Sequence, residues 1–314
     1  MNSTESSTAV VVVTVTEDNL DQRIDNFLMS RLKGVPKSVI YRIIRKGEVR
    51  VNKGRVKPEY KLKIGDNVRV PPVRVRPEAD KNLFVGDPLK KRLEASIVHE
   101  DDGLIVINKP SGIAVHGGSG VSLGVIEALR LMRPQQSYLE LVHRLDRDTS
   151  GCLMIAKKRS VLKKLHDDLR ENRMEKTYTA LLWGRWNGLQ HRIDAPLRKF
   201  HLPSGERVVR VSADGKPSLT LFRQLELYDN ATLVEAKPVT GRTHQIRVHA
   251  QHGGHAIAGD DKYLHREQGD YFAEKGLQRL FLHASVLQLV DVQGQKQRFK
   301  APLPDELKAF LERL

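Results

Sequence analysis

The segment HRLDRDTSG, residues 143–151, places two aspartates beside two arginines between apolar runs. A guanidinium close to a carboxylate lowers the carboxyl pKa, so an aspartate in this setting stays ionised at neutral pH. An ionised carboxylate that is held in position can act as a nucleophile or as a general base. Asp146 follows the apolar pattern of residues 141–145, which predicts a strand end from which its side chain points into a cleft. Asp146 is therefore the first candidate for a catalytic residue.

The residues that follow Asp146 also allow a purely structural interpretation. Asp148, Thr149 and Ser150 precede Gly151, and short polar side chains in such a run commonly hydrogen-bond to their own backbone in a turn. Taken by itself, the sequence pattern favours that turn for these three residues.

Other patterns point to chemistry that their context does not support. GVSLG, residues 120–124, matches a nucleophile elbow around Ser122, but a strand does not run straight into it, so a loop is the better interpretation. His244 and His249 stand five residues apart in a predicted helix, which is the wrong spacing for two metal ligands, and Arg247 between them would repel a cation. The glycine fingerprint of a nucleotide site is also missing. We expect neither a metal nor another cofactor.

The positive charge of the chain is concentrated near its N-terminus. The 314 residues carry a net charge of +15. Residues 21–76 hold 16 Lys+Arg against 5 Asp+Glu, a net charge of +11, whereas the remaining residues have a net charge of +4. A compact basic segment of this kind predicts a polyanionic partner. The residues expected to contact it are Lys37, Arg42, Arg45, Lys46, Arg50, Lys53 and Arg55.

Hydrophobic periodicity predicts the elements that position these side chains. The expected helices cover residues 20–32, 36–46, 124–132 and 160–172. The clearest expected strands cover residues 176–186, 219–230 and 231–239. Strands outnumber helices and do not alternate strictly with them, which predicts an α+β fold with a mixed, largely antiparallel sheet.

The single cysteine, Cys152, makes an intrachain disulfide impossible, and a reducing compartment is expected. The N-terminus lacks the positive region of a secretory signal, and no apolar run approaches the length of a membrane span. These features predict a cytoplasmic protein. Because the chain lacks coiled-coil heptads, we expect a monomer.

Several segments resemble one enzyme family. HRLDRDTSG resembles the defining motif of the RluA family of pseudouridine synthases, whose first aspartate is catalytic and corresponds to Asp146. EKTYTALLWG, residues 175–184, resembles the segment with the active-site tyrosine, here Tyr178. GRTHQIRVHAQHGGHAIAGDDKY resembles the segment whose arginine, here Arg247, pairs with that aspartate. RLFLHA resembles the last strand of the pocket, and NKPSGIAVHGG also fits.

The resemblance implies a domain order. It predicts a catalytic domain with the pseudouridine synthase fold over residues 93–314. A small basic alpha-L RNA-binding domain, of the type found in ribosomal proteins, is expected over residues 17–80. Residues 1–16 are then a polar tail and residues 81–92 a linker.

The resemblance also implies a reaction, the isomerisation of specific uridines to pseudouridine in large-subunit (23S) ribosomal RNA. The base is flipped out, its glycosidic bond is cleaved, and the ring is rejoined through carbon 5. Asp146 acts on the sugar as nucleophile or base, and Arg247 holds it charged. Tyr178 packs against the base and takes the proton from carbon 5, while Arg144 stacks in the space that the base leaves. The other residues expected to bind substrate are His143, Leu145, Thr149, Lys176, His244, Gln245, Leu282 and His283.

A non-catalytic RNA-binding or ribosome-assembly factor on the same scaffold is the alternative, because the basic segment fits both functions equally. Taken singly, Tyr178 fits a core aromatic on a strand, and Arg247 fits a surface charge on a helix. The joint presence of Asp146, Tyr178 and Arg247 favours the enzyme, since a pure binder has no physical need for all three.

Overall fold

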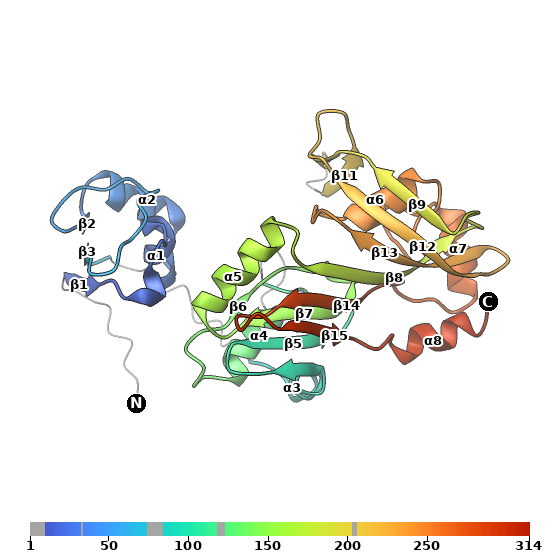
Figure 1. Ribbon diagram of the computed structural model, residues 1–314, viewed down its shortest axis with the longest axis horizontal. Coiled ribbons are helices and arrows are strands. Elements are labelled where there is room, and N and C mark those ends of the chain that lie inside the picture. The colour runs from blue at the N-terminus through green and yellow to red at the C-terminus, as the bar shows by residue number, and fades with distance from the viewer. Residues whose placement is uncertain (1–9, 33, 74–83, 118–122, 203–205) are drawn as a thin grey trace. The chain divides into compact units, whose positions relative to one another are not determined.

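The computed structural model describes residues 10–32, 34–73, 84–117, 123–202 and 206–314. The chain folds into two compact units, residues 1–83 and residues 84–314 (Figure 1). Most of the expected tail, residues 81–83 of the expected linker, and Ser122 lie outside the described residues.

The first unit packs two helices against a three-stranded antiparallel sheet. Its helices are α1 (Ile24–Arg31) and α2 (Lys37–Arg45), after a short 3-10 turn, η1 (Glu17–Asn19). The strands lie in the order β1 (Val11–Thr14), β3 (Asn67–Val70), β2 (Arg50–Val51). Pro36 directly precedes α2, and Gly47 follows its end with a φ of 72°, a backbone conformation that favours glycine. Both helices expected from the sequence of this segment are present, but the first begins at Ile24 and not at Leu20.

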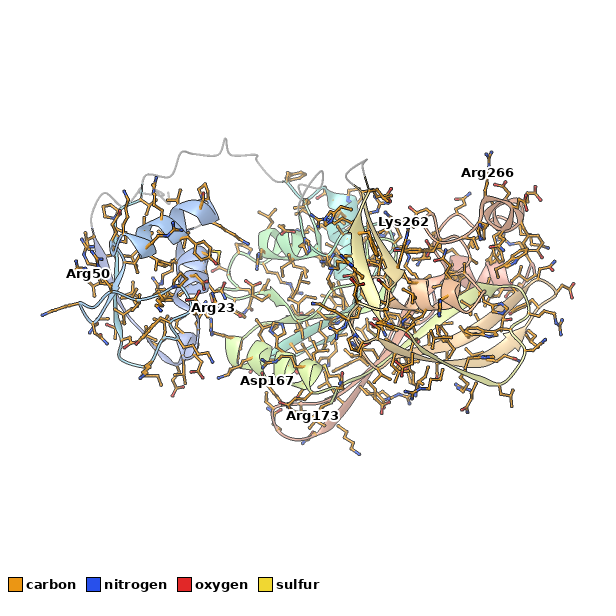
Figure 2. All side chains as sticks on the ribbon, turned by 90° about the horizontal axis from the view of Figure 1, so that it is seen from above. Arg23, Arg50, Asp167, Arg173, Lys262 and Arg266 are labelled. Carbon is orange, nitrogen blue, oxygen red and sulfur yellow. The ribbon has the colours of Figure 1, made fainter. Side chains whose placement is uncertain are left out.

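Helix α2 separates apolar from basic side chains. Ile40, Ile43 and Ile44 are buried in the core of the first unit. The basic residues that were expected to meet a polyanion are all exposed, and Arg50 is labelled on this unit in Figure 2. The amphipathic pattern therefore leaves a basic, solvent-facing surface on the first unit.

The second unit is built on one ten-stranded sheet. Its main path is β4 (Ile97–Glu100), β5 (Leu104–Lys109), β7 (Ser150–Ala156), β14 (Leu282–Val290), β8 (Glu175–Trp183), β13 (Ala231–Pro238), β12 (Leu219–Leu227) and β9 (Gln190–Asp194). Two further strands, β6 (Glu140–Leu141) and β15 (Lys296–Lys300), pair with β7 and β14. Only β7 and β14 run parallel among the described pairs, so the expected α+β, largely antiparallel architecture is confirmed.

Helices cover both faces of the β5–β7 end of this sheet. Ile105 and Leu153 pack on one side with α4 (Val125–Met132), and Val106 and Met154 on the other with α5 (Arg159–Arg170). This alternation follows from the two-residue period of a strand. At the other end lies α6 (Gln245–His252), near β12 and β13 in Figure 1. Its Ile246 packs in a core cluster with residues of β8, β12 and β13. The remaining elements are α7 (Arg266–Glu274), α8 (Asp305–Leu311) and the hairpin β10 (Leu197–His201) and β11 (Arg207–Val211).

Two features differ from the sequence-based expectation. Part of the stretch expected to be linker is helical, because α3 (Asp87–Glu94) starts with Pro88 in its first turn and buries Leu93 in the core. The central region around β9, β10 and β11, where regular structure was not predicted, contains three strands. Within the described residues, no helix is long and apolar enough to cross a membrane.

Candidate active site

Asp146 lies in a loop between β6 and β7, not at a strand end as expected. Strand β6 ends at Leu141, although the backbone N–H of Val142 still donates to the carbonyl of Met154 at 3.0 Å. The return bond of this pair is different, because the N–H of Met154 donates to Nε2 of His143 at 3.2 Å instead of to the carbonyl of Val142. Burial lowers the pKa of His143 to about 3, so this ring is neutral and can accept. The ring of His143 thus takes the place of the Val142 carbonyl as hydrogen-bond acceptor. Residues 143–149 form a loop instead of continuing the strand.

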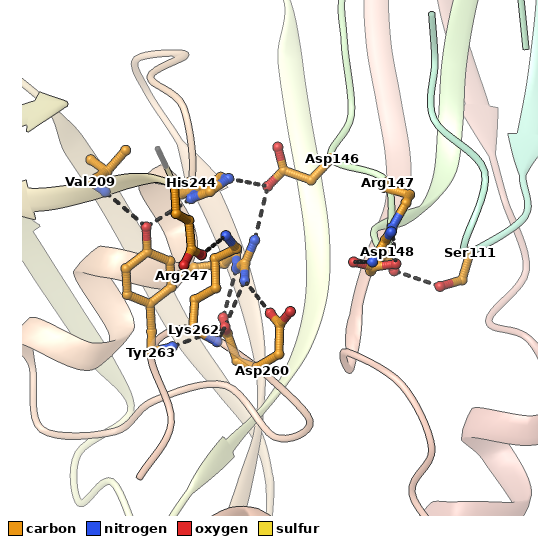
Figure 3. A network of polar contacts seen from close by, with 12 residues as sticks. Ser111, Asp146, Arg147, Asp148, Val209, His244, Arg247, Asp260, Lys262 and Tyr263 are labelled. Carbon is orange, nitrogen blue, oxygen red and sulfur yellow. Dashed lines mark hydrogen bonds and ion pairs between the residues drawn. The ribbon is translucent and has the colours of Figure 1, made fainter. Parts of the chain in front are cut away.

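The loop is held in place by the last residue of β5 and by the segment that follows this strand. Lys109 is fully buried and donates from Nζ to the carbonyls of Pro110, Ile113 and Arg147, each at 2.9 Å. Ser111 donates to the carbonyl of Asp148 at 2.7 Å (Figure 3). These contacts fix the backbone on either side of Asp148, so the position of Asp146 is determined by its surroundings.

Arg247 on α6 contacts Asp146 and is anchored by a second carboxylate. Its Nη1 lies 3.6 Å from Oδ2 of Asp146. The guanidinium donates to Asp260 at 2.7 and 2.6 Å and to Asp261 at 3.2 Å. Burial alone would lower the pKa of Arg247, but the hydrogen bonds to Asp260 outweigh it and raise that pKa. Arg247 is therefore a permanent buried cation rather than a surface charge, at 4 % exposure.

His244 approaches the same carboxylate oxygen from the beginning of α6. Its Nε2 lies 3.8 Å from Oδ2 of Asp146, and its Nδ1 lies 2.8 Å from the hydroxyl of Tyr263. Its backbone has a φ of 52°, an unusual conformation for a residue with a side chain. His244 immediately precedes α6, so the start of this helix brings His244 and Arg247 to the same carboxylate oxygen. Burial lowers the pKa of His244, which favours the neutral ring.

Tyr178 and Lys176 lie two residues apart on β8 and so face the same side of the sheet. Burial, together with the charge of Asp146, raises the pKa of Tyr178, so its phenol stays protonated. Burial also lowers the pKa of Lys176. Strand β8 thus brings one aromatic ring and one amine to the site.

These side chains line a cavity of about 550 Å³, a size typical of small-molecule sites. Of the residues predicted to be catalytic or to bind substrate, the lining includes His143, Arg144, Leu145, Asp146, Thr149, Lys176, Tyr178, His244, Gln245, Arg247 and Leu282. The amide of Gln245 is already engaged with Thr240, Arg242, Leu219 and Thr220. Its contacts therefore fix the loop that precedes α6.

His283 does not line this cavity, contrary to the expectation that it binds substrate. Its ring is fully buried, with Nδ1 2.9 Å from Oγ of Ser150 and Nε2 3.0 Å from the carbonyl of Ala301. The side chain at 283 faces the opposite side of β14 from Leu282, because neighbouring strand residues alternate. His283 is a structural residue that ties β7 to the segment after β15.

The burial of His283 predicts a pH dependence of stability. Burial lowers its pKa to about 4, whereas an unfolded imidazole has a pKa of about 6.5. Between these pH values the imidazole is protonated in the unfolded chain but neutral in the folded chain. The free energy of unfolding therefore falls as the pH falls. We expect this histidine to contribute a loss of about 1.5 kcal/mol between pH 6.5 and 5. Urea denaturation should show a shallower pH slope for His283→Gln, and an unchanged slope would contradict the prediction.

Comparisons with known proteins show the family of this chain. The model of the RNA pseudouridylate synthase family matches residues 103–252, and the model of the S4 domain matches residues 22–68. A Haemophilus influenzae protein named ribosomal large subunit pseudouridine synthase C is 57% identical over 309 residues, 98% of this chain and 96% of that protein. This chain belongs to the RNA pseudouridylate synthase family.

Other members of the pseudouridylate synthase family give the same result. The Escherichia coli K12 protein named ribosomal large subunit pseudouridine synthase C is 56% identical over 98% of this chain and 97% of its own length. The structure of human RNA pseudouridylate synthase domain containing 4 superposes with a TM-score of 0.60 at 27% identity. That match covers 72% of this chain and 95% of the human chain.

The sequence reasoning missed three residues around the cavity of this pseudouridylate synthase: Lys109, Asp260 and Tyr263. Each acts through a predicted residue or its loop, so a pattern search for catalytic side chains passes over it. A usable signal existed for Asp260, because a pair of aspartates follows a glycine turn in an otherwise apolar segment. The described residues contain no group of three or more His, Cys, Asp and Glu side chains placed to hold a metal ion.

Proposed function

We propose that this protein isomerises specific uridines of large-subunit (23S) ribosomal RNA to pseudouridine. The observation that carries the proposal is the position of Asp146, which faces the buried cation Arg247 in the cavity that Tyr178 also lines. The curated relatives named ribosomal large subunit pseudouridine synthase C support the choice of substrate. An inert RNA-binding scaffold would not need a buried arginine held against a cavity carboxylate.

The proposed reaction needs only atoms of the substrate. The bond between carbon 1′ of the ribose and N1 of uracil breaks, a bond from carbon 1′ to carbon 5 forms, and one hydrogen moves from carbon 5 to N1. A uridine in folded RNA has to be flipped out before this can happen. We propose that Asp146 acts on the sugar as nucleophile or base, with Arg247 orienting its carboxylate. The balance requires no cofactor, and we expect a monomer.

Tyr178 and Arg144 have different proposed roles. The neutral ring of Tyr178 suits stacking on uracil, and its phenol removes the proton from carbon 5 only if its own proton is released first. Arg144 lines the cavity and is exposed, so its planar guanidinium is free to stack where the base has left. His143, Leu145, Thr149, Lys176, His244, Gln245 and Leu282 complete the proposed substrate-binding set.

We propose that the first unit, within residues 17–80, binds RNA backbone, and that residues 93–314 hold the catalytic machinery. Replacing Lys37, Arg42 and Arg45 with glutamine should weaken RNA binding and flatten its salt dependence, because phosphate contacts release counterions. Each lost contact should reduce the slope of log K against log salt by about 0.7–0.9. Filter binding at several salt concentrations measures both quantities.

A control variant with the same change in net charge separates the effect of specific RNA contacts from the effect of the overall charge of the protein. Arg266, Lys296 and Lys300 are exposed in the second unit, and Figure 2 shows Arg266 extending away from it. Their replacement with glutamine should leave the slope nearly unchanged. Equal effects of the two triple variants would show that the basic face of the first unit is not a specific RNA contact.

The function itself is tested by chemical mapping of ribosomal RNA with a carbodiimide that marks pseudouridine. RNA from cells without the gene should lack marks that are present in the parent strain and restored by the cloned gene. Purified protein should also introduce the same marks into unmodified RNA. Identical maps in all strains would refute the proposed function.

A further inference from the structure

A hydroxyl group outside the cavity lies in hydrogen-bond contact with one of the residues that face Asp146. Tyr263 follows the buried Asp260 in the chain and does not line the cavity. Its ring is 6 % exposed, and its side chain packs with Leu197, Val209 and Val248. Its hydroxyl lies 2.8 Å from Nδ1 of His244 (Figure 3). Tyr263 can therefore influence the reaction only through another side chain.

The hydrogen bonds of Tyr263 determine which way its proton points. In the described part of the chain, its hydroxyl contacts the backbone N–H of Val209 at 3.1 Å and Nδ1 of His244. The N–H of Val209 can only donate, so the phenol oxygen accepts it. The phenol proton then has Nδ1 of His244 as its acceptor, and any other arrangement leaves a buried O–H without a partner. Burial raises the pKa of Tyr263, which keeps this proton in place.

We infer that Tyr263 is a positioning residue that fixes the tautomer of His244, so that the N–H at Nε2 points at the carboxylate of Asp146. A neutral imidazole that accepts at Nδ1 carries its proton on Nε2. That nitrogen lies 3.8 Å from Oδ2 of Asp146. The inference rests on the proposed function, because it assigns a role in the same reaction.

Two donors then face one oxygen of Asp146, at distances slightly longer than a hydrogen bond, and leave the other oxygen for the substrate. Nη1 of Arg247 lies 3.6 Å from Oδ2, the oxygen that Nε2 of His244 also faces. Figure 3 shows both dashed lines meeting at this oxygen. Within the described residues, no hydrogen bond or ion pair involves Oδ1. A carboxylate oriented in this way presents a single oxygen to the ribose.

The left-handed backbone of His244 supports a functional reason for this geometry. A φ of 52° in a residue with a side chain costs energy and persists where surrounding contacts enforce it. Here it places the ring between the hydroxyl of Tyr263 and the carboxylate of Asp146. Arg247 also lies over the ring of Tyr263, with Cζ 5.1 Å from its centre, so a single tyrosine contacts both donors.

The substitution Tyr263→Phe separates this role from simple packing. Phenylalanine keeps the ring under Arg247 and removes only the hydroxyl. We expect the single-turnover rate on large-subunit RNA to fall about 10- to 100-fold, because a misoriented catalytic group costs rate rather than binding. The dissociation constant for RNA should stay within about twofold. The control is Tyr228→Phe, which loses one hydrogen bond, to Glu226, outside the cavity lining, whereas Tyr263→Phe loses the bonds to Val209 and His244.

The decisive measurement is the tautomer of His244 in full-length protein labelled with nitrogen-15 in histidine. Long-range nitrogen–proton correlation spectra should show the proton on Nε2 in the wild type and a mixture or the Nδ1 form in Tyr263→Phe. A proton on Nδ1 in the wild type overturns the inference whether or not the variant folds. An unchanged tautomer in the variant also overturns it, as does a changed tautomer with an unchanged rate.

A double variant tests the route through His244. Glutamine at position 244 places an amide N–H near the position of Nε2 without needing a fixed tautomer, so His244→Gln should retain part of the activity. Tyr263→Phe should cause no further loss in that background, and an equal loss in both backgrounds overturns the inference. Failure of the proposed function is a separate result, because the wild type would then produce no pseudouridine while the tautomer spectrum stayed interpretable.

Discussion

Asp146→Asn should reduce pseudouridine formation by about 10⁴-fold or more, because the amide is neither a nucleophile nor a base. The substitution preserves the shape of the side chain in its cavity and removes its charge beside Arg247. RNA affinity should be retained or slightly increased, since one negative charge is lost near a polyanion. Release of tritium from carbon 5 of labelled uridine measures turnover, and filter binding measures affinity.

Asp148→Asn is the matched control for that experiment. Asp148 lies in the same loop and pairs with Arg147, but its side chain is 36% exposed and does not line the cavity. This variant should react at nearly the rate of the wild type. If Asp146→Asn also reacts at a rate close to the wild type, the catalytic assignment is wrong.

Asp260→Asn should give the largest loss of stability, about 3–5 kcal/mol, because it leaves the buried guanidinium of Arg247 without its full counter-charge. Asp260 has a side-chain exposure of 0% and receives hydrogen bonds from Arg247 and from the backbone of Lys262 and Tyr263. Turnover should also fall, since Arg247 orients Asp146. Urea denaturation gives the free energy of unfolding, and the tritium assay gives the rate.

The neighbouring aspartate provides a sharp comparison. Asp261 contacts the same guanidinium at 3.2 Å, but its side chain is 67% exposed. Exposed pairs contribute little, so Asp261→Asn should change the stability by less than about 1 kcal/mol. Equal effects of the two substitutions would show that burial does not control the strength of this ion pair.

Much of the fold was predictable because its elements carry strong local patterns. Helices α2, α4 and α5 bury regular apolar stripes, and β8, β12 and β13 have long runs suited to strands. The end of β6 was not predictable, because the ring of His143 replaces a backbone acceptor and the apolar pattern continues past it. Periodicity reports which residues are buried, and it does not report which group accepts each hydrogen bond.

In the candidate site, too, some residues were predictable from the sequence and others were not. Asp146, Tyr178 and Arg247 were identified through their motifs, and the structure brings them to one cavity. Asp260 and Tyr263 act on Arg247 and His244 through contacts formed only in the folded chain. His283 stands beside Leu282 in sequence but faces the other side of β14, an orientation that the motif does not encode.

Strand β14 has a consequence for the order of biosynthesis. It lies between β7 and β8, whose last residues precede the start of β14 by 126 and 99 residues. The loop of Asp146 leads into β7, whereas Tyr178 belongs to β8. The position of Asp146 relative to Tyr178 therefore depends on β14, which is synthesised after both strands. Gly151 permits the insertion, because a Cβ there would lie 2.3 Å from the carbonyl oxygen of Ala284. A nascent chain halted before residue 282 should therefore be inactive and readily cleaved by protease, and activity should emerge only when β14 has left the ribosome.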